Sequence, residues 1–158
     1  MAEQKTNVMR LLEQKKIKYT AHEYPHSGEA VDGVSVARLT GQAVEQVFKT
    51  LVARGASKTV YVFVIPVAEE LDLKKAAKSA GEKSIAMIHV NEITALTGYV
   101  RGGCSPVGMK KQYKTFYHSS CRDQDKIIVS AGKIGYQIEL SPDELIGITR
   151  GTVSDLTV

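Results

Sequence analysis

The chain has 158 residues and a mass of 17.2 kDa, and 43% of its residues are hydrophobic. A chain of this length buries roughly 70% of its unfolded surface, which is enough for one hydrophobic core, so we predict a single domain over residues 1–158. The formal charge of +4 is compatible with RNA as a partner but too low for a nucleic-acid coat protein.

Hydropathy and cysteine usage exclude several further classes of protein. The segment 1–16 is polar and lacks the apolar core of a signal peptide, and nowhere do about eighteen apolar residues follow one another. Cys104 and Cys121 lie in no spacing typical of a zinc site or a disulfide framework. We therefore expect a cytoplasmic protein with free thiols and without a membrane partner, a metal ion or another cofactor.

The predicted elements begin with a helix. Thr6 or Asn7 can cap it, and apolar residues at helical spacing extend it to about Lys16. The segment 18–24 alternates loosely between polar and apolar residues. It ends at Pro25, after which a turn-rich stretch predicts a surface loop.

A short helix and a β-hairpin are predicted next. The helix covers about residues 33–40, and Gly41 suits its C-terminal cap. Two β-rich runs follow, 47–54 and 60–67, and the turn-forming residues 55–58 stand between them. This pattern is typical of a hairpin, which we place at the centre of a sheet.

The middle of the chain predicts a helix, a strand and a second, shorter helix. The segment 69–81 contains good helix formers with apolar residues on one face and ends at Gly81. Residues 84–90 read as a strand. A short helix then begins with Asn91 as its N-cap and is closed by Gly98.

An irregular segment follows, which we call the glycine loop (residues 99–108). It contains too many glycine and proline residues for a regular element and leads through a basic run into a strand near 113–118. Two further strands, 126–132 and 136–140, are joined by a short turn.

The last predicted helix starts at a capping box. Ser141 and Glu144 have the spacing of that motif, and Pro142 stands at the first helical position of a helix that runs through Ile148. Residues 152–158 either add an edge strand or fray. Strands and helices in this mixed order, with hairpin-length connections, predict an α+β domain around a mixed or antiparallel sheet.

Lys49 is the first candidate for a functional residue. It shares a strand face with Val47, Leu51 and Ala53, so its ammonium points toward an apolar layer. Burial of an unpaired ammonium costs several kcal/mol. Lys49 therefore extends to solvent, pairs with a carboxylate, or faces a cleft that receives an anion or a carbonyl oxygen, and the pattern leaves these interpretations open.

The glycine loop is the second candidate. Its glycines and proline can direct backbone N–H groups toward one point, as in an oxyanion hole or a phosphate nest, although an ordinary turn has the same composition. Cys104 suggests a nucleophile, but no general base is placed for it.

The remaining candidates are weaker. His22 and His26 have the spacing of a helical metal pair, but Pro25 interrupts the segment, so we do not expect a metal site. Two lysine clusters can contact phosphates or merely solvate the surface. They comprise Lys74, Lys75 and Lys78 in the first case and Lys110, Lys111 and Lys114 in the second.

Four parts of the sequence carry a resemblance to a known family. They are Tyr24, the strand segment 48–51, the segment 71–81 (LDLKKAAKSAG) and the segment 97–108 (TGYVRGGCSPVG). In this order they resemble the YbaK/EbsC family of Cys-tRNA(Pro) deacylases over nearly the whole chain. The wider superfamily includes the editing insert of prolyl-tRNA synthetases and free-standing Ala-tRNA(Pro) deacylases. The resemblance implies a single editing domain with a mixed, barrel-like β-sheet flanked by helices.

The resemblance also implies an activity, the deacylation of Cys-tRNA(Pro) or Cys-tRNA(Cys) in trans. Hydrophobic pockets of similar volume discriminate by only about 1–3 kcal/mol, so a synthetase needs a second site to remove cysteine. In the family the thiol of the substrate is taken to attack its own ester carbonyl, which gives a cyclic thiolactone and free tRNA. The implied partners are tRNA(Pro), tRNA(Cys) and prolyl-tRNA synthetase, and we expect no DNA partner.

Two alternatives to this function stay open. The same fold can serve Ala-tRNA(Pro), which has no thiol, so that activated water must attack the ester. A non-catalytic module can bind tRNA or a synthetase through its lysine clusters while Lys49 only packs.

The resemblance assigns roles to individual residues. Lys49 matches the essential lysine of the family and is the expected catalytic or orienting residue. Gln137 stands where some relatives carry aspartate. Glu139 lies on the same strand face, and the sequence leaves open whether it substitutes for that carboxylate. Cys104 occupies a position that the family does not require to be cysteine, so we interpret it as a bystander. The expected substrate-binding residues are Tyr24, Phe48, Thr50, Gly102, Gly103, Ser105, Pro106, Gly108, Ser130 and Gln137.

Overall fold

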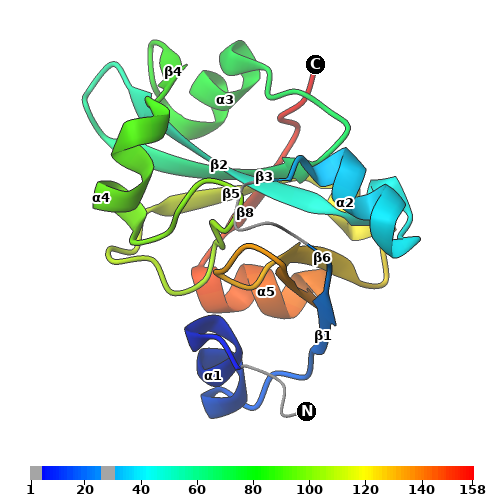
Figure 1. Cartoon of the computed structure of the whole chain (residues 1–158). Coiled ribbons are helices and arrows are strands. Elements are labelled where there is room, and N and C mark those ends of the chain that lie inside the picture. The colour runs from blue at the N-terminus through cyan, green and yellow to red at the C-terminus, as the bar shows by residue number, and fades with distance from the viewer. Residues whose placement is uncertain (1–4, 26–30) are drawn as a thin grey trace.

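The structure is a computed structural model that describes residues 5–25 and 31–158. In these ranges the chain forms two β-sheets with short helices around them (Figure 1). This arrangement confirms the predicted α+β class. His26 lies outside the described residues, and so does most of the loop predicted after Pro25.

The helices and strands have the following bounds. The helices are α1 (Asn7–Gln14), α2 (Gly33–Thr40), α3 (Leu73–Ala80), α4 (Ile93–Thr97) and α5 (Pro142–Thr149), and the 3₁₀ turns are η1 (Val44–Gln46), η2 (Val90–Glu92) and η3 (Ser119–Asp123). The strands are β1 (Thr20–Glu23), β2 (Phe48–Gly55), β3 (Val60–Pro66), β4 (Ile85–Met87), β5 (Lys114–His118), β6 (Ile127–Ser130), β7 (Tyr136–Leu140) and β8 (Thr152–Ser154). No helix in the described ranges is long and apolar enough to cross a bilayer.

The strands of the described ranges form a three-stranded sheet in the order β1-β7-β6 and a five-stranded sheet in the order β4-β2-β3-β5-β8. β2 pairs antiparallel with β3 and β4, whereas β5 pairs parallel with β3 and β8, so the larger sheet is mixed, as predicted. A parallel bridge between Val47 and Ile128 connects the two sheets. The predicted hairpin of β2 and β3 is confirmed, and β3 is central in its sheet.

Both faces of β3 are buried. Tyr61, Phe63 and Ile65 belong to a core cluster that also contains residues of α3. Val62 and Val64 belong to a second cluster, which contains residues of α1, β6 and β7. A strand that is covered on both faces has no need of polar alternation, which explains its continuous apolar run.

Local capping signals predicted several helix ends correctly. The Thr6 side chain accepts a hydrogen bond from a backbone N–H in the first turn of α1. Gly41, Gly81 and Gly98 follow α2, α3 and α4 in the left-handed conformation, as predicted. Glycine adopts this conformation without the steric cost of a Cβ.

The segment predicted as the strand 84–90 and a helix capped by Asn91 differs in the structure. The strand ends at Met87, and the chain then enters the 3₁₀ turn η2, in which Asn91 is an internal residue. The turn begins at His89, because the Glu92 carboxylate accepts the backbone N–H of His89 at 3.0 Å. This reciprocal cap starts the helical turn before Asn91 and displaces it from the predicted role.

Two other helix ends also depart from prediction. Ser141 is the N-cap residue of α5, but its side chain makes no capping hydrogen bond, so the predicted capping box is not formed. The helix still starts at Pro142, as predicted, because the proline ring presets φ and the Leu145 N–H donates to the Ser141 carbonyl at 3.1 Å. α1 ends at Gln14 and not near Lys16, which has a φ of 59°.

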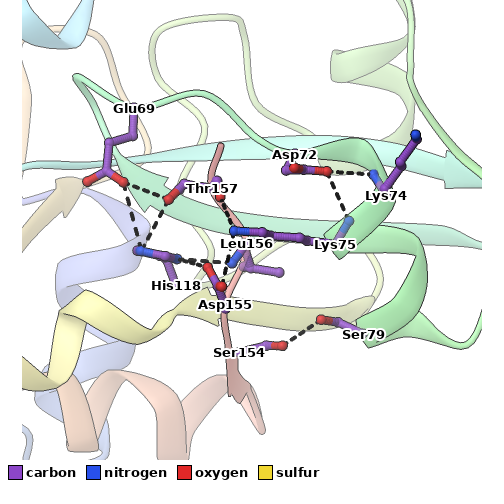
Figure 2. A network of polar contacts seen from close by, with 10 residues as sticks. All are labelled: Glu69, Asp72, Lys74, Lys75, Ser79, His118, Ser154, Asp155, Leu156 and Thr157. Atoms are coloured by element: carbon purple, nitrogen blue, oxygen red, sulfur yellow. Dashed lines mark hydrogen bonds and ion pairs between the residues drawn. The ribbon is translucent and has the colours of Figure 1, made fainter.

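The C-terminal tail (residues 155–158) continues from β8, which forms the predicted edge strand, and is held by polar contacts (Figure 2). The backbone N–H of Leu156 donates to Nδ1 of the buried His118 at 3.0 Å. Lys75 Nζ donates to the Thr157 carbonyl at 2.7 Å. These contacts explain why the tail is anchored and does not fray.

Main-chain contacts link the tail to the segment between β3 and α3. Asp72 N–H donates to the Leu156 carbonyl at 2.7 Å, and Val158 N–H donates to the Glu70 carbonyl at 3.1 Å. The segment held in this way follows Val67, which lines the cavity described next. The tail therefore holds the segment between β3 and α3 in place.

Candidate active site

A cavity of about 760 Å³ opens along one edge of β2. β4 pairs with β2 only from Ala53 to Gly55, so the preceding part of this edge is left to form a cavity wall. The N-terminus of α2, the segment 87–93, the glycine loop and the adjoining ends of β6 and β7 complete the lining. The volume is typical of a small-ligand site.

Seven of the predicted site residues line this one cavity. Lys49 in β2 and Gly102 in the glycine loop are far apart in the sequence, and the fold brings them to the same space. Of the three interpretations given for Lys49, the structure therefore favours the one in which it faces a cleft. The seven are Tyr24, Phe48, Lys49, Thr50, Gly102, Ser130 and Gln137.

Four other predicted residues of the glycine loop do not line the cavity. Ser105 and Pro106 are buried. A Cβ on Gly103 would lie 3.0 Å from the Ile134 backbone nitrogen, and Gly108 has a φ of 77°. The close approach at Gly103 and the positive φ at Gly108 both favour glycine, so these two residues serve the conformation of the loop.

Lys49 is a half-buried cation that has no direct partner among residues 5–25 and 31–158. None of the carboxylates in the described ranges lies within ion-pair distance of its Nζ, which argues against the paired interpretation. Burial lowers the pKa of the Lys49 ammonium below its ordinary value, and the negative charge of Glu70 opposes this shift in part. An ammonium in this state gains from an oxygen ligand in the cavity.

Thr50 presents a second unsatisfied group at the cavity. Its Oγ1 is buried and has no hydrogen-bond partner among the described residues. A buried hydroxyl in this state costs about 1–3 kcal/mol. A polar ligand beside Thr50 can supply the missing partner.

The positions of Gln137 and Glu139 show whether Glu139 can replace the aspartate that some relatives carry at position 137. Gln137 is buried, lines the cavity, and accepts a hydrogen bond from Gln42 Nε2 at 2.9 Å. The Glu139 carboxylate contacts His22 Nε2 at 2.7 Å and Gln46 Nε2 at 3.1 Å, and it does not line the cavity. Glu139 therefore does not bring a carboxylate to the position that Gln137 occupies.

Cys104 lines the cavity but has the protonation state of an unreactive thiol. Burial raises its pKa to about 11. The thiolate that a nucleophile requires is thus scarce at neutral pH. Within residues 5–25 and 31–158, no three His, Cys, Asp or Glu side chains gather in a group that could hold a metal ion.

Several lining residues were not predicted from the sequence. Arg101 lies beside Gly102, and this adjacency was the signal that could have identified it. Asp32 lines the cavity at the start of α2, and hydrogen bonds from the Ser35 N–H and hydroxyl hold its pKa below the ordinary value. Met87 and Val90 form an apolar part of the wall, and both are partly exposed.

The lysine clusters lie apart from the cavity lining. Lys75 donates to the C-terminal tail and pairs with Asp155 at 3.1 Å, so its charge is already engaged. Lys114 lies over the ring of Phe116 at 5.6 Å. Lys75 is therefore not the free phosphate contact that the patch hypothesis requires.

Comparisons with known proteins show the family to which the chain belongs. Residues 29–148 match the model of the family described as "Aminoacyl-tRNA editing domain". Over 155 residues the chain is 45% identical to an Enterococcus faecalis (strain ATCC 700802 / V583) protein named "Putative Cys-tRNA(Pro)/Cys-tRNA(Cys) deacylase EbsC", with 98% of this chain and 94% of that protein covered.

Two solved structures are similar to the whole chain. The crystal structure of "a putative trans-editing enzyme for prolyl tRNA synthetase" has a TM-score of 0.81 and 26% identity, covering 96% of this chain and 94% of that one. The hypothetical protein APE2540 has a TM-score of 0.87 and 23% identity, with 97% and 100% covered, which shows the shared fold. The chain belongs to the aminoacyl-tRNA editing domain family.

Proposed function

We propose that this chain is a cytoplasmic editing enzyme that acts as one domain over residues 1–158 and deacylates mischarged Cys-tRNA(Pro), with Cys-tRNA(Cys) as a second substrate. The observation that carries the proposal is the cavity shared by Lys49 and Gly102. The name of the E. faecalis relative supports the choice of substrates. The name of a similar solved structure supports action in trans to prolyl-tRNA synthetase, with which a complex is expected.

The proposed chemistry uses the thiol of the substrate. Its sulfur attacks the ester carbonyl carbon, the bond from that carbon to the ribose oxygen breaks, and the thiol proton goes to the ribose oxygen. The products are a cyclic thiolactone and free tRNA, so no water is consumed. The Lys49 ammonium donates to the ester carbonyl oxygen as negative charge develops there, and Thr50 and Gly102 position the ester. The other predicted glycine-loop residues hold the loop in shape.

The test of this function is deacylation of purified charged tRNA(Pro). Cys-tRNA(Pro) should be deacylated at least about tenfold faster than Ser-tRNA(Pro), since a hydroxyl is a much weaker nucleophile than a thiol. Product analysis should find the thiolactone or the cysteine formed from it. Equal rates for Ala-tRNA(Pro) would favour attack by water, and binding without deacylation of any charged tRNA would favour a non-catalytic module.

Replacement of Cys104 by serine is expected to leave turnover of Cys-tRNA(Pro) within a few-fold of wild type. The reason is that burial raises the pKa of the Cys104 thiol to about 11, so the enzyme has little thiolate to use. Single-turnover rates of the two proteins at neutral pH measure the effect. Complete loss of activity in a folded Cys104→Ser protein would restore the thiolate hypothesis.

A further inference from the structure

Arg101 is held at the cavity by a tight turn of the glycine loop. The Gly103 N–H donates to the Val100 carbonyl at 3.0 Å, and Gly102 has a φ of 85°, so Arg101 occupies the second position of a closed turn. The close approach of Gly103 to the Ile134 backbone fixes this turn against the connection between β6 and β7. The turn therefore fixes the position of the Arg101 backbone in the glycine loop.

The guanidinium of Arg101 has no partner in the described part of the chain. It makes none of the ion pairs or hydrogen bonds found there, whereas Arg54 pairs with Glu92 at 3.1 Å and Arg122 pairs with Asp143 at 3.4 Å. Arg101 is exposed and lines the cavity. It is therefore available to a ligand that enters there.

The charges around the cavity favour an anion near Arg101. Among the residues that the structure describes, the charged ones that line the cavity are Lys49, Arg101 and Asp32. Both oxygens of the Asp32 carboxylate are turned to Ser35, at 2.9 Å from its N–H and 2.7 Å from its hydroxyl. Within the described ranges, the lining thus holds two cations without a direct partner and one carboxylate whose two oxygens accept hydrogen bonds from Ser35. The planar fork of an arginine suits phosphate oxygens better than a point charge does.

The proposed substrate allows only one kind of anion at this position. A cysteinyl ester carries an α-amino group, which repels a guanidinium when it is protonated, and an uncharged carbonyl. The terminal ribose bears the ester and has no phosphate on that side. The nearest anion is the phosphate that joins the terminal nucleoside to the preceding nucleotide.

We infer that Arg101 binds the last internucleotide phosphate of the acceptor strand and thereby makes the cavity select esters that are attached to a polynucleotide. This inference rests on the proposed function and deepens it. Lys49 then serves the ester end of the cavity and Arg101 the nucleotide end. The aminoacyl group enters between them with its ammonium directed away from Arg101.

The experiment compares two substrates and four proteins. The substrates are Cys-tRNA(Pro) and 3′-O-cysteinyladenosine, which lacks the phosphate, and the proteins are wild type, Arg101→Gln, Arg101→Lys and the control Arg10→Gln. Arg10 is an exposed residue of α1 that does not line the cavity and loses the same charge. Arg101→Gln should raise KM for Cys-tRNA(Pro) about tenfold, which corresponds to about 1.4 kcal/mol. It should leave the kinetics of cysteinyladenosine unchanged.

Salt dependence provides a second readout, which a merely structural role would not move. For Cys-tRNA(Pro), Arg101→Gln should reduce the slope of log(kcat/KM) against log salt concentration by about 0.7, the value for one lost contact to a single-strand phosphate. Arg101→Lys should recover the slope but only part of the affinity, because lysine keeps the charge and loses the fork. Arg10→Gln should match wild type in both measurements.

Other outcomes overturn the inference. Equal losses on both substrates, or unchanged KM and slope for Cys-tRNA(Pro), would mean that Arg101 does not contact the phosphate. Binding of the uncharged trinucleotide CCA, measured by fluorescence anisotropy, separates this failure from that of the proposed function. If no charged tRNA is deacylated while Arg101→Gln still weakens CCA binding, the proposed function fails and the phosphate contact stands. If CCA binding is also unchanged, the contact fails.

Discussion

Replacement of Lys49 by methionine is expected to lower the deacylation rate of Cys-tRNA(Pro) by about 10²–10³-fold, the usual effect of removing one donor from a developing oxyanion. Methionine has a similar length and keeps the apolar stem, so packing of β2 should survive. Single-turnover kinetics with saturating enzyme measure the chemical step. Exposed Lys126, replaced by methionine, is the matched control and should leave the rate unchanged. Full activity of Lys49→Met would remove Lys49 from the mechanism.

The same substitution is expected not to lower the melting temperature at neutral pH. Burial lowers the pKa of Lys49 in the folded protein, so folding disfavours the charged ammonium. This cost is fully present below the folded pKa and disappears as pH rises through the window up to the unfolded value, about 10.4. Lys49→Met removes the cost at neutral pH. Thermal melts at neutral pH would therefore contradict this account if the variant were markedly less stable than wild type.

Replacement of Leu156 by alanine is expected to lower the free energy of unfolding by about 2–5 kcal/mol, the usual cost of this truncation in a core. Leu156 is fully buried and belongs to the cluster that contains Phe63 and Phe116. The Leu156 backbone is held on both sides by hydrogen bonds to His118 and Asp72, so the side chain is fixed at its place in the core. Denaturant unfolding at equilibrium measures the change.

Leu39 is the matched control for this prediction, because its side chain is 58% exposed. Leu39→Ala should change the free energy of unfolding by no more than about 0.5 kcal/mol. A loss below about 1 kcal/mol in Leu156→Ala would show that the tail is not part of the core. Because the tail supports the segment after Val67, we also expect Leu156→Ala to weaken deacylation at temperatures where the protein begins to unfold.

Local signals in the sequence were sufficient for much of the fold. The bounds of α2, the glycines that end α2, α3 and α4, and the hairpin of β2 and β3 all depend on neighbours within a few residues, and these predictions are confirmed. The error at Asn91 is also local, because a second cap between His89 and Glu92 was available and was adopted. At Ser141 the predicted start of α5 at Pro142 is confirmed, and only the side-chain hydrogen bond of the capping box is missing.

Residue types marked Lys49 and the glycine loop as candidates for a site, although the same pattern also fits a lysine that extends to solvent and an ordinary turn. Their meeting in one cavity could not be recognised from residue types, since it depends on β4 leaving half of the β2 edge open and on the two sheets joining at Val47 and Ile128. Only that packing placed Arg101 and Asp32 in the lining and turned Glu139 away toward His22. Pairing between distant strands is set by the burial of both sheets at once, and no local stretch of the sequence encodes it.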